Sequence, residues 1–567
     1  MTLAAIVFSR TVAHAGDTGG DPKIGVTGVV KNAAGQPVAG AYIKVKNQDL
    51  GLTFLVVSQD KGRYSTPNLL AGKYTVQGFG GGYQSELSVP IEVSNGQPGK
   101  MDLVLSTAQK ISPRGRRRTT EDYAGLMPDG DGKPIVMTHC TFCHSVERIV
   151  PARSGKDVWQ KTVGRMNAYL AGRPDLQKEH SVGPIPENQI GTVVDYLTKS
   201  FGPDTPPLPE EKIFSGPNDN LPVTFAKGTE SKFVAMELDR RGIFNVYDVN
   251  LDSQGTVWVS GRQSPQRTVG NVGNRREMDR IIGQNATGAL GRFDPQTMSI
   301  ISIPLPPDKP SSVLGAIAVD PQDNVWISDR DNKSTHWYEY KPKANEFQTF
   351  EIPPPLTLPV SVIREPVNAN TLRFQDGNVW GVGNPTSRVL QLDPRTSKVT
   401  QFPVPLGSHP HGFVVGKDKA IWYATIMDQD VVRLDPASGN LTHYPVGIVD
   451  GGSRMTADAD GNLWIVSRPG KLAKVEYRTG KVTKYDTPSR EPWSFGIDAD
   501  TTRNFVWFDE TDAGKIARVD PRTGKFVEFP LPTATMGYIV RVIVDPTNSN
   551  RVWWSAPGEI GYTEVIE

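Results

Sequence analysis

Five consecutive residues, Cys140-Thr141-Phe142-Cys143-His144, carry the most specific chemical signal in the chain. Two thiols three positions apart on a starting helix can reach both vinyl groups of one haem, and the adjacent histidine can then bind the iron. These are the only two cysteines among 567 residues, which excludes a disulfide scaffold and a multi-cysteine zinc or iron–sulfur site. The spacing predicts one covalent haem c attached at Cys140 and Cys143, with His144 on the iron. A free dithiol is the alternative.

A helix after this motif offers the second axial ligand. Apolar residues recur there at the spacing of one helical face: Trp159, Val163, Met166 and Leu170. The stretch "CTFCHSVERIVPARSGKDVWQKTVGRM" resembles a short class of monohaem cytochrome c domains, in which a Trp-x6-Met helix presents the axial methionine. The resemblance implies Met166 as the sixth ligand, whereas His180 or an open iron are the alternatives, and a core position is the plainer reading of Met166. Met/His ligation raises the potential and suits electron transfer.

The N-terminal residues predict export. A short apolar run, 3–8, precedes Ala13-His14-Ala15, a pattern that fits signal-peptidase cleavage before Gly16. We therefore expect residues 1–15 to be a signal peptide with a truncated start, although a ragged cytoplasmic N-terminus would look similar. Haem attachment of this kind occurs outside the cytoplasm, so the predicted location is the periplasm. No later run approaches the roughly 20 apolar residues of a membrane helix, and no membrane span is expected.

Tryptophans repeat through the C-terminal 340 residues or so and decide the fold there. They occur at Trp258, Trp326, Trp380, Trp422, Trp464, Trp507 and Trp553, and four of the six spacings are 42, 42, 43 and 46 residues. Each unit reads as four strands separated by Asp, Gly or Pro turns, which is the pattern of a propeller blade. We expect a seven-bladed β-propeller over 230–567. Residues 232–239 should supply the missing outer strand of the last blade, because "KFVAMELD" matches "KFVEFPLP" in the preceding one.

Three segments precede the propeller. Residues 24–108 alternate apolar and polar residues and predict a β-sandwich; "VTGVVKNAAGQPVAGAYIKV…GRYSTPNLLAGKYTV" resembles the carboxypeptidase regulatory-like domain, which implies a spacer or adhesion module. Residues 109–123, rich in arginine, read as a linker, and 124–205 as the small helical cytochrome c domain. The predicted fold class is mainly β: a seven-bladed β-propeller with a small α-helical cytochrome c domain and an N-terminal β-sandwich.

Loops at the propeller's mouth supply the candidate binding residues. The main candidates are His411, Arg454, Glu491, Trp493, Arg541, Arg262 and Arg330, and further mouth positions are Tyr247, Asp329, Arg373, Asn384, His409, Arg468, Glu510 and Tyr538. Six arginines against three carboxylates predict an anionic or oxygen-rich ligand, because the guanidinium group matches carboxylate and phosphate. For each single residue, a solvated rim position or a blade-to-blade salt bridge is the alternative.

The repeats "SHPHGFVVGKDKAIWYATIMDQDVVRLDP" and "DADGNLWIV" resemble the virginiamycin B lyase (streptogramin lyase) family of seven-bladed propellers. That family opens a cyclic depsipeptide by elimination at an ester, with a divalent metal and a histidine base in a Glu-Pro-His-Gly motif. Here Glu491-Pro492 is followed by Trp493, and Pro410-His411-Gly412 has no glutamate before it. Indole neither binds a metal nor takes a proton, so the resemblance implies the fold more strongly than the activity.

Composition narrows the function further. With 62 basic and 61 acidic residues, the chain gives no electrostatic reason to bind nucleic acid or an anionic membrane. Four propeller histidines are too few for a multi-copper cluster, and blue copper would need a cysteine. The leading hypothesis is a periplasmic oxidoreductase or electron-transfer protein, whose propeller binds a small anionic or aromatic substrate or a redox partner protein. A metal-dependent C–O lyase with a divalent ion in the propeller and a non-catalytic binding or sensor protein are the alternatives.

Overall fold

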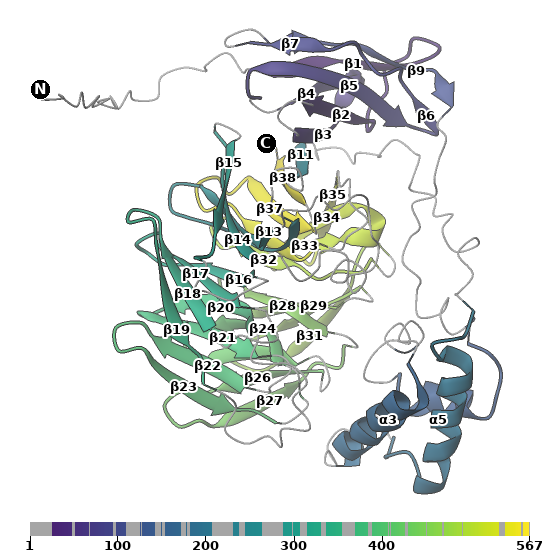
Figure 1. Cartoon of the computed structure of the whole chain (residues 1–567), viewed down its shortest axis with the longest axis vertical. Coiled ribbons are helices and arrows are strands. Elements are labelled where there is room, and N and C mark those ends of the chain that lie inside the picture. Colours follow the sequence, from purple (N-terminus) through teal and green to yellow (C-terminus); the bar gives the residue numbers. More distant parts are fainter. Residues whose placement is uncertain are drawn as a thin grey trace, which may run out of the picture.

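The computed structural model describes residues 25–47, 52–66, 69–94, 98–108, 125, 127–141, 149, 154–171, 177, 182–206, 231–237, 244–263, 287–296, 299–306, 314–329, 336–353, 369–383, 388–405, 408, 410–425, 429–448, 451–467, 470–489, 492–531, 539–556 and 559–565. Strands dominate these residues, and the longer helices gather between 132 and 201 (Figure 1). The predicted mainly β class is confirmed.

Two β-sheets with a common core form the N-terminal domain. One contains β1 (Val26–Asn32), β4 (Arg63–Ser65), β8 (Gly99–Lys100) and β9 (Leu103–Leu105), and the other contains β2 (Tyr42–Asn47), β3 (Leu52–Val57), β5 (Gly72–Gly80), β6 (Tyr83–Gln84), β7 (Ile91–Val93) and β10 (Thr107–Ala108). A short 3-10 turn, η1 (Asp60–Gly62), leads into β4. In β5, the side chains of Tyr74 and Val76 are buried, whereas that of the neighbouring Lys73 is exposed. This alternation has the two-residue period of a strand.

Six four-stranded antiparallel sheets follow in chain order and form the first six propeller blades. Blade 1 contains β12 (Phe244–Leu251), β13 (Val257–Gln263), β14 (Thr287–Asp294) and β15 (Ser299–Pro304). Blade 2 contains β16 (Leu314–Val319), β17 (Val325–Asp329), β18 (His336–Lys341) and β19 (Glu346–Glu351), and blade 3 contains β20 (Ala369–Gln375), β21 (Asn378–Gly383), β22 (Arg388–Asp393) and β23 (Lys398–Pro403).

The next three blades repeat the arrangement. Blade 4 contains β24 (Pro410–Val415), β25 (Ile421–Thr425), β26 (Asp430–Leu434) and β27 (Leu441–Pro445). Blade 5 contains β28 (Gly451–Ala457), β29 (Leu463–Ser467), β30 (Lys471–Val475) and β31 (Val482–Asp486). Blade 6 contains β32 (Ile497–Asp500), β33 (Phe505–Glu510), the 3-10 turn η5 (Thr511–Ala513), β34 (Lys515–Val519) and β35 (Phe526–Pro530).

The seventh blade closes the ring with strands from both ends of the propeller sequence. It contains β36 (Arg541–Val544), β37 (Arg551–Ala556), β38 (Glu559–Val565) and, outermost, β11 (Ser231–Glu237). β11 pairs antiparallel with β38 from Ser231 opposite Val565 to Glu237 opposite Glu559. The predicted closure by the segment around 232–239 is confirmed.

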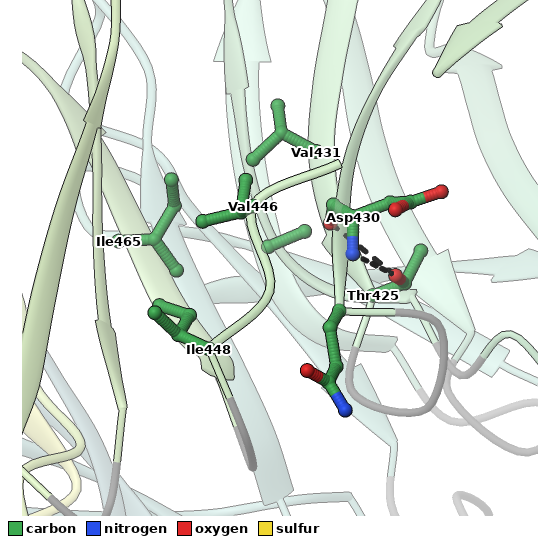
Figure 2. Close-up of a pocket in the computed structure, with 8 residues that line it drawn as sticks. Thr425, Asp430, Val431, Val446, Ile448 and Ile465 are labelled. Carbon is green, nitrogen blue, oxygen red and sulfur yellow. Dashed lines mark hydrogen bonds between the residues drawn. The ribbon is translucent and has the colours of Figure 1, made fainter. Parts of the chain in front are cut away.

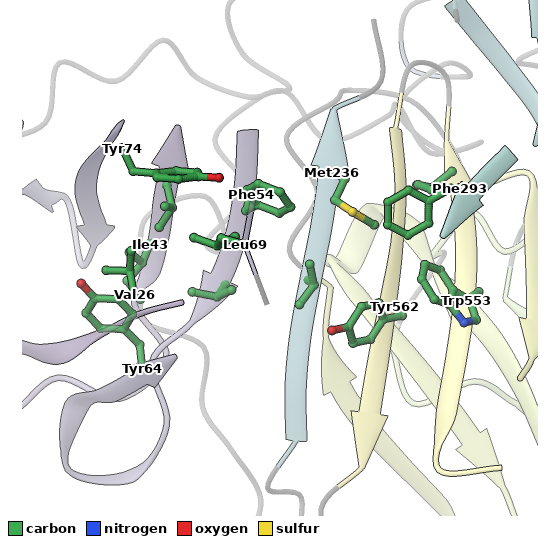
Figure 3. Close-up of a cluster of buried hydrophobic side chains, with 14 of the residues drawn as sticks. Val26, Ile43, Phe54, Tyr64, Leu69, Tyr74, Met236, Phe293, Trp553 and Tyr562 are labelled. Carbon is green, nitrogen blue, oxygen red and sulfur yellow. The ribbon is translucent and has the colours of Figure 1, made fainter. Parts of the chain in front are cut away.

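The N-terminal domain adds its own sheet to this closing strand. β3 pairs antiparallel with the free edge of β11, with Leu55 opposite Ala235 and Phe54 opposite Met236, so one sheet of ten strands runs through both domains. Figure 3 shows Phe54 on one side of Met236 and Tyr562 on the other, within a single buried cluster. An exposed strand edge is an aggregation hazard, and this pairing covers it. The sandwich is therefore a structural extension of blade 7.

An aspartate before each of five repeat tryptophans explains why the units fold alike. In blade 5, Asp458 Oδ1 accepts hydrogen bonds from the backbone N–H groups of Asp460 and Asn462 at 3.0 and 2.9 Å, which closes the turn. Asp458 Oδ2 accepts the indole N–H of Trp464 at 2.8 Å. The same indole-to-aspartate bond recurs in other blades: Trp258 to Asp252, Trp326 to Asp320, Trp422 to Asp418 and Trp553 to Asp545. The tryptophans are thus structural core residues.

Three helices lie between the sandwich and the propeller in the sequence, and they share a small apolar core. They are α2 (Gly132–His139), α3 (Lys156–Ala171) and α5 (Glu187–Phe201). α2 approaches α5 closely at Gly132, where a Cβ atom would lie 2.3 Å from the Cβ of Tyr196. The predicted helical segment is present, and Trp159 and Val163 are buried on the predicted face of α3. Among the described residues, no helix is long and apolar enough to cross a bilayer.

Candidate functional site

The innermost strands of three blades carry charged side chains at one level of the propeller axis. In each blade a residue of the innermost strand lies opposite the repeat tryptophan, and Asp248 of β12, Arg454 of β28 and Arg541 of β36 each lie two residues before it. Because the innermost strands surround the propeller axis, residues at the same level of different blades lie close together. Their side chains are 1%, 0% and 3% exposed.

Direct contacts join these groups across the axis. Arg454 Nη2 lies 3.5 Å from Asp248 Oδ1, and Arg541 Nε lies 3.8 Å from the same oxygen. Arg373 of β20 and Asp498 of β32 lie opposite their own blades' tryptophans, one level further along the strands, and interact electrostatically with the other three. We call these five residues the axial charge cluster.

Burial and mutual repulsion lower the pKa values of Arg373 and Arg541. Loss of solvation, first, and the charges of Arg541 and Arg454 lower the pKa of Arg373 to about 9, and Asp498 and Asp248 oppose the change. The pKa of Arg541 is lowered for the same first reason. Arg373 nevertheless keeps part of its surface accessible, which is expected of a side chain that lines the axis.

Hydrogen bonds between blades that are not neighbours fix the inner strands around the cluster. Tyr247 Oη of blade 1 donates to the backbone oxygen of Asn370 in blade 3 at 3.3 Å. Arg454 Nη1 of blade 5 donates to Thr371 Oγ1, also in blade 3, at 3.3 Å. The Arg454 guanidinium also lies 6.0 Å from the centre of the Tyr247 ring. These bonds cross the axis and hold the guanidinium group in place.

Five of the predicted mouth residues lie at the axis, and two of them are Tyr247 and Arg373 described above. Arg454 and Arg541 belong to the axial charge cluster, and the ring of His411 packs edge-on against Phe495 with 5.4 Å between ring centres. Because both arginines share Asp248, the blade-to-blade ion pair that the sequence left open as an alternative is present for them. His411 is 6% exposed, so little of it faces solvent.

Trp493, one of the predicted mouth residues, has an unusual backbone conformation. Its φ is 55°, in the left-handed region, and its side chain is half-buried. Such a conformation costs about 1–3 kcal/mol for a bulky residue and concentrates at functional sites. Several other predicted residues, or their side chains, lie outside the described residues: Cys143, His144, His180, Arg262, Arg330, Asn384, His409, Arg468, Glu491 and Tyr538.

The two carboxylates of the axial charge cluster were not among the site residues predicted from the sequence. Asp248 and Asp498 lie inside strands that read as apolar core, in "FNVYDVNL" and "FGIDAD". A charged residue within the innermost strand of a blade was the signal that could have identified them. Both carboxylates also hold neighbouring strands: Asp248 Oδ2 accepts the N–H of Ile317 at 3.1 Å, and Asp498 Oδ2 accepts that of Val544 at 2.9 Å.

A second cluster, in blade 6, joins two carboxyl groups. Ser489 Oγ lies 3.0 Å from Glu510 Oε2 and 3.1 Å from Glu528 Oε1, and Lys515 Nζ donates to Glu528 Oε1 at 2.8 Å. Burial, first, and the adjacent Glu528 raise the pKa of Glu510 to about 8. The pair therefore holds one proton near neutral pH, and the ion pair with Lys515 places the negative charge on Glu528.

The helical domain places Cys140, the described cysteine of the C-x-x-C-H motif, against its core. Cys140 follows the last turn of α2, and its N–H donates to the backbone oxygen of Val136 at 2.9 Å. Burial raises the pKa of the Cys140 thiol to about 12. Trp159 is 5% exposed, and its indole N–H has no hydrogen-bond acceptor within the described chain. Met166, about two turns further along α3, is half-buried.

A small pocket between blades 4 and 5 is shown in Figure 2. Its cavity volume is about 10 Å³, and its walls are apolar apart from Thr425, Gln429 and Asp430. Thr425 Oγ1 accepts the N–H of Asp430 at 3.1 Å, so these polar groups serve the strand connection. Small-molecule sites usually measure about 300–1,000 Å³, and this pocket is too small for that class.

Metal ligands were expected in the propeller if it follows the lyase chemistry. Among the residues that the structure describes, no three His, Cys, Asp or Glu side chains converge. Glu491 and His409 lie outside those residues, so the divalent-metal expectation stays a prediction.

Two family models match the chain. Residues 296–563 match the virginiamycin B lyase family, and residues 25–106 match the carboxypeptidase regulatory-like domain. Comparison with curated proteins gives no match.

Solved structures with a similar fold include two lyases. Virginiamycin B lyase from Staphylococcus aureus is 17% identical, with a TM-score of 0.47, and the match covers 59% of this chain and 100% of that one. A streptogramin B lyase structure is 18% identical, with a TM-score of 0.46, and the match covers 60% of this chain and 100% of that one. The chain thus carries a virginiamycin B lyase-like propeller domain and a carboxypeptidase regulatory-like domain.

Proposed function

We propose that the protein is an exported c-type cytochrome fused to a lyase-like propeller, and that it transfers single electrons in the periplasm. Residues 124–205 would hold one haem c through Cys140 and Cys143, and His144 and Met166 would bind its iron. The propeller binds a small anionic or aromatic substrate or a redox partner protein. The single observation that carries the proposal is the C-x-x-C-H motif starting where α2 ends, against a three-helix core.

The residues of the helical domain fit a haem. The buried indole N–H of Trp159 lacks an acceptor in the described chain, and leaving such a donor unpaired costs free energy. A haem propionate is an acceptor of the right chemistry. Met166 lies on the same face of α3 as Trp159 and is only half-buried, so its thioether is available as a ligand. When bound, the haem supplies a one-electron couple whose potential a methionine ligand raises.

The described thiol does not suit the alternative of a reactive dithiol. Redox-active cysteines have lowered pKa values, because the thiolate is the nucleophile. Burial instead raises the pKa of Cys140 to about 12, so the thiol stays protonated at neutral pH. This favours a cysteine committed to a structural or covalent role over a thiol–disulfide exchange site.

The cationic propeller axis supports a substrate or partner that carries negative charge. Arg373, which keeps part of its surface accessible, is the arginine of the axial charge cluster that such a molecule can reach. A haem tethered to such a binding platform meets the bound molecule at a high effective concentration.

A redox assay tests this function. Exported, oxidised holoprotein is mixed with fractions of periplasmic small molecules, and haem reduction is followed by its visible spectrum. A fraction that reduces the wild type but not the His411→Ala variant supports a propeller substrate. If only added cytochrome or dithionite reduces the haem, the propeller does not deliver substrate electrons to it.

The lyase alternative has one observation in its favour, the match of 296–563 to the lyase family. It requires ester elimination that stops when a chelator removes the divalent metal and that continues in a folded Cys140→Ala variant. Loss of turnover in that variant would rule it out.

A further inference from the structure

We propose that the propeller axis contains a buried binding site for one small inorganic monoanion, such as chloride, held by Arg454 and Arg541. The site is structural and does not depend on the haem or on the substrate proposed above. Its occupant ties blades 5 and 7 together on the axis.

Unpaired donors point to the site. Nε and Nη2 of Arg454 and Nε and Nη1 of Arg541 are fully buried and have no hydrogen-bond acceptor within the described chain. Both side chains are almost completely buried, at 0% and 3% exposure. Buried guanidinium donors are costly unless an acceptor meets them, so four such atoms in one place require a partner.

Asp248 does not fill this need. Its Oδ1 lies 3.5 Å from Arg454 Nη2 and 3.8 Å from Arg541 Nε, whereas charge-assisted hydrogen bonds measure about 2.7–2.9 Å. Its two oxygens already accept backbone N–H groups, Oδ1 that of Val249 and Oδ2 that of Ile317, each at 3.1 Å. The aspartate is therefore anchored to strands β12 and β16 and cannot move closer to both arginines.

The charge count fits one monoanion. Three arginines and two aspartates leave the axial charge cluster with one uncompensated positive charge in a desolvated place. One chloride, bromide or nitrate would neutralise it, whereas a divalent anion would leave an excess of negative charge. Loss of solvation already lowers the pKa of Arg373 and Arg541, and a bound anion would oppose that change.

The surrounding side chains limit the size of the anion. Gly496 of blade 6 occupies the same level as Arg454 of blade 5 and Arg541 of blade 7, and it places no side chain between them. A Cβ at Gly496 would lie 2.7 Å from the N atom of Val542, so the strands approach closely here. This close approach favours an ion of a few atoms over a bulky carboxylate.

Thermal unfolding of the full-length holoprotein tests the proposal. Tm is measured while sodium chloride replaces sodium gluconate at constant ionic strength, so that only the small anion changes. A ligand that binds the folded state raises Tm with concentration and then levels off. We expect such saturation with chloride, bromide and nitrate, whereas sulfate, which is excluded from protein surfaces, should raise Tm without saturating. Equal Tm values in chloride and gluconate would overturn the proposal.

Charge-changing variants give the test its direction. Arg541→Met leaves the cluster neutral and should abolish the chloride dependence, whereas Asp248→Asn adds one positive charge and should tighten chloride binding about tenfold. The matched control is Arg388→Met, since Arg388 is also 2% exposed with unpaired guanidinium atoms but lies in β22, the third strand of blade 3. Chloride dependence lost equally in the control would contradict an axial site.

A direct readout remains if Arg541→Met does not fold. Crystals of the wild type grown with bromide should show an anomalous peak within hydrogen-bond distance of Arg454 and Arg541. A crystal without a peak there, despite bromide at other sites, would overturn the proposal.

Discussion

Met236 of β11 lies opposite Phe54 of β3, and this pair joins the N-terminal sandwich to the closing blade of the propeller. Both side chains are buried, at 1% and 0% exposure, in a cluster that also includes Tyr562 and Trp553 of blade 7 (Figure 3). The strand that closes the ring is therefore shared between two domains. It follows that the sandwich and the propeller support each other's folding.

Met236→Ala tests this dependence. Removing a fully buried methionine side chain should lower the free energy of unfolding by about 2–4 kcal/mol. Because the cluster spans both domains, the sandwich and the propeller should unfold in one lowered transition by calorimetry. The control is Ile301→Ala in β15, where the side chain is 55% exposed and the change should stay within about 0.5 kcal/mol. Separate transitions for the two domains would contradict a shared core.

Asp458→Ala should show how much a repeat aspartate stabilises its blade. The change leaves the Trp464 indole and the backbone N–H groups of Asp460 and Asn462 without their acceptor. We expect a loss of about 2–4 kcal/mol by denaturant unfolding. Asp486→Ala, at a side chain that is 81% exposed, is the control and should change little. A small effect of Asp458→Ala would mean that the tryptophan's packing alone fixes the turn.

The acid pair of blade 6 predicts a pH dependence of stability. The pKa of Glu510 is raised from its ordinary value of 4.5 to about 8, so the folded protein binds more protons than the unfolded chain between these values. The free energy of unfolding should therefore fall as pH rises from about 4.5 to about 8. Asp509, with a pKa raised to about 7 by burial, contributes in the same direction.

Glu510→Gln should flatten this pH profile and raise stability at pH 8 relative to the wild type, because the buried carboxylate is removed. Glu351→Gln, at an exposed strand end, should keep the wild-type slope. Urea unfolding between pH 5 and 8 measures both. An unchanged slope in Glu510→Gln would show that the carboxyl group is ionised throughout this range.

Met166→Ala should change the haem spectrum while leaving the haem attached. If the thioether binds the iron, its loss removes the methionine–iron charge-transfer band of the oxidised protein and lowers the reduction potential. Met137→Ala is the matched control, since Met137 packs against the same helical core from α2. Retention of the band in Met166→Ala would leave His180 or another group as the ligand.

Periodic features were predictable from the sequence because each repeat contains its own signal. The tryptophan period and the likeness of "KFVAMELD" to "KFVEFPLP" identified the blades and the closing strand, and both are present in the structure. Pairing of β3 with β11 left no such signal, since it joins residues about 180 positions apart through a strand edge.

The axis was predictable only in part. Arg454 and Arg541 were predicted as binding residues from their residue type and their place near the propeller's mouth. Their partner Asp248 lies in a strand whose sequence is typical of the apolar core. Whether an arginine is free for a ligand or already paired depends on which blades face each other across the axis, and local patterns do not contain that information. The pairing of Glu510 with Glu528 could not be predicted from the sequence for the same reason, since one residue lies in β33 and the other in β35.

The most direct test of the proposed cytochrome is the haem that stays with the denatured polypeptide. Residues 16–567 are produced behind a signal peptide of a host that matures c-type cytochromes, and periplasmic protein is extracted with acidic acetone to remove non-covalent haem. We predict that mass spectrometry of the residue finds one haem per chain, bound to a peptide containing Cys140 and Cys143, and that a Cys140→Ser, Cys143→Ser double variant has none. An intact chain with two free thiols and no bound haem would contradict the account.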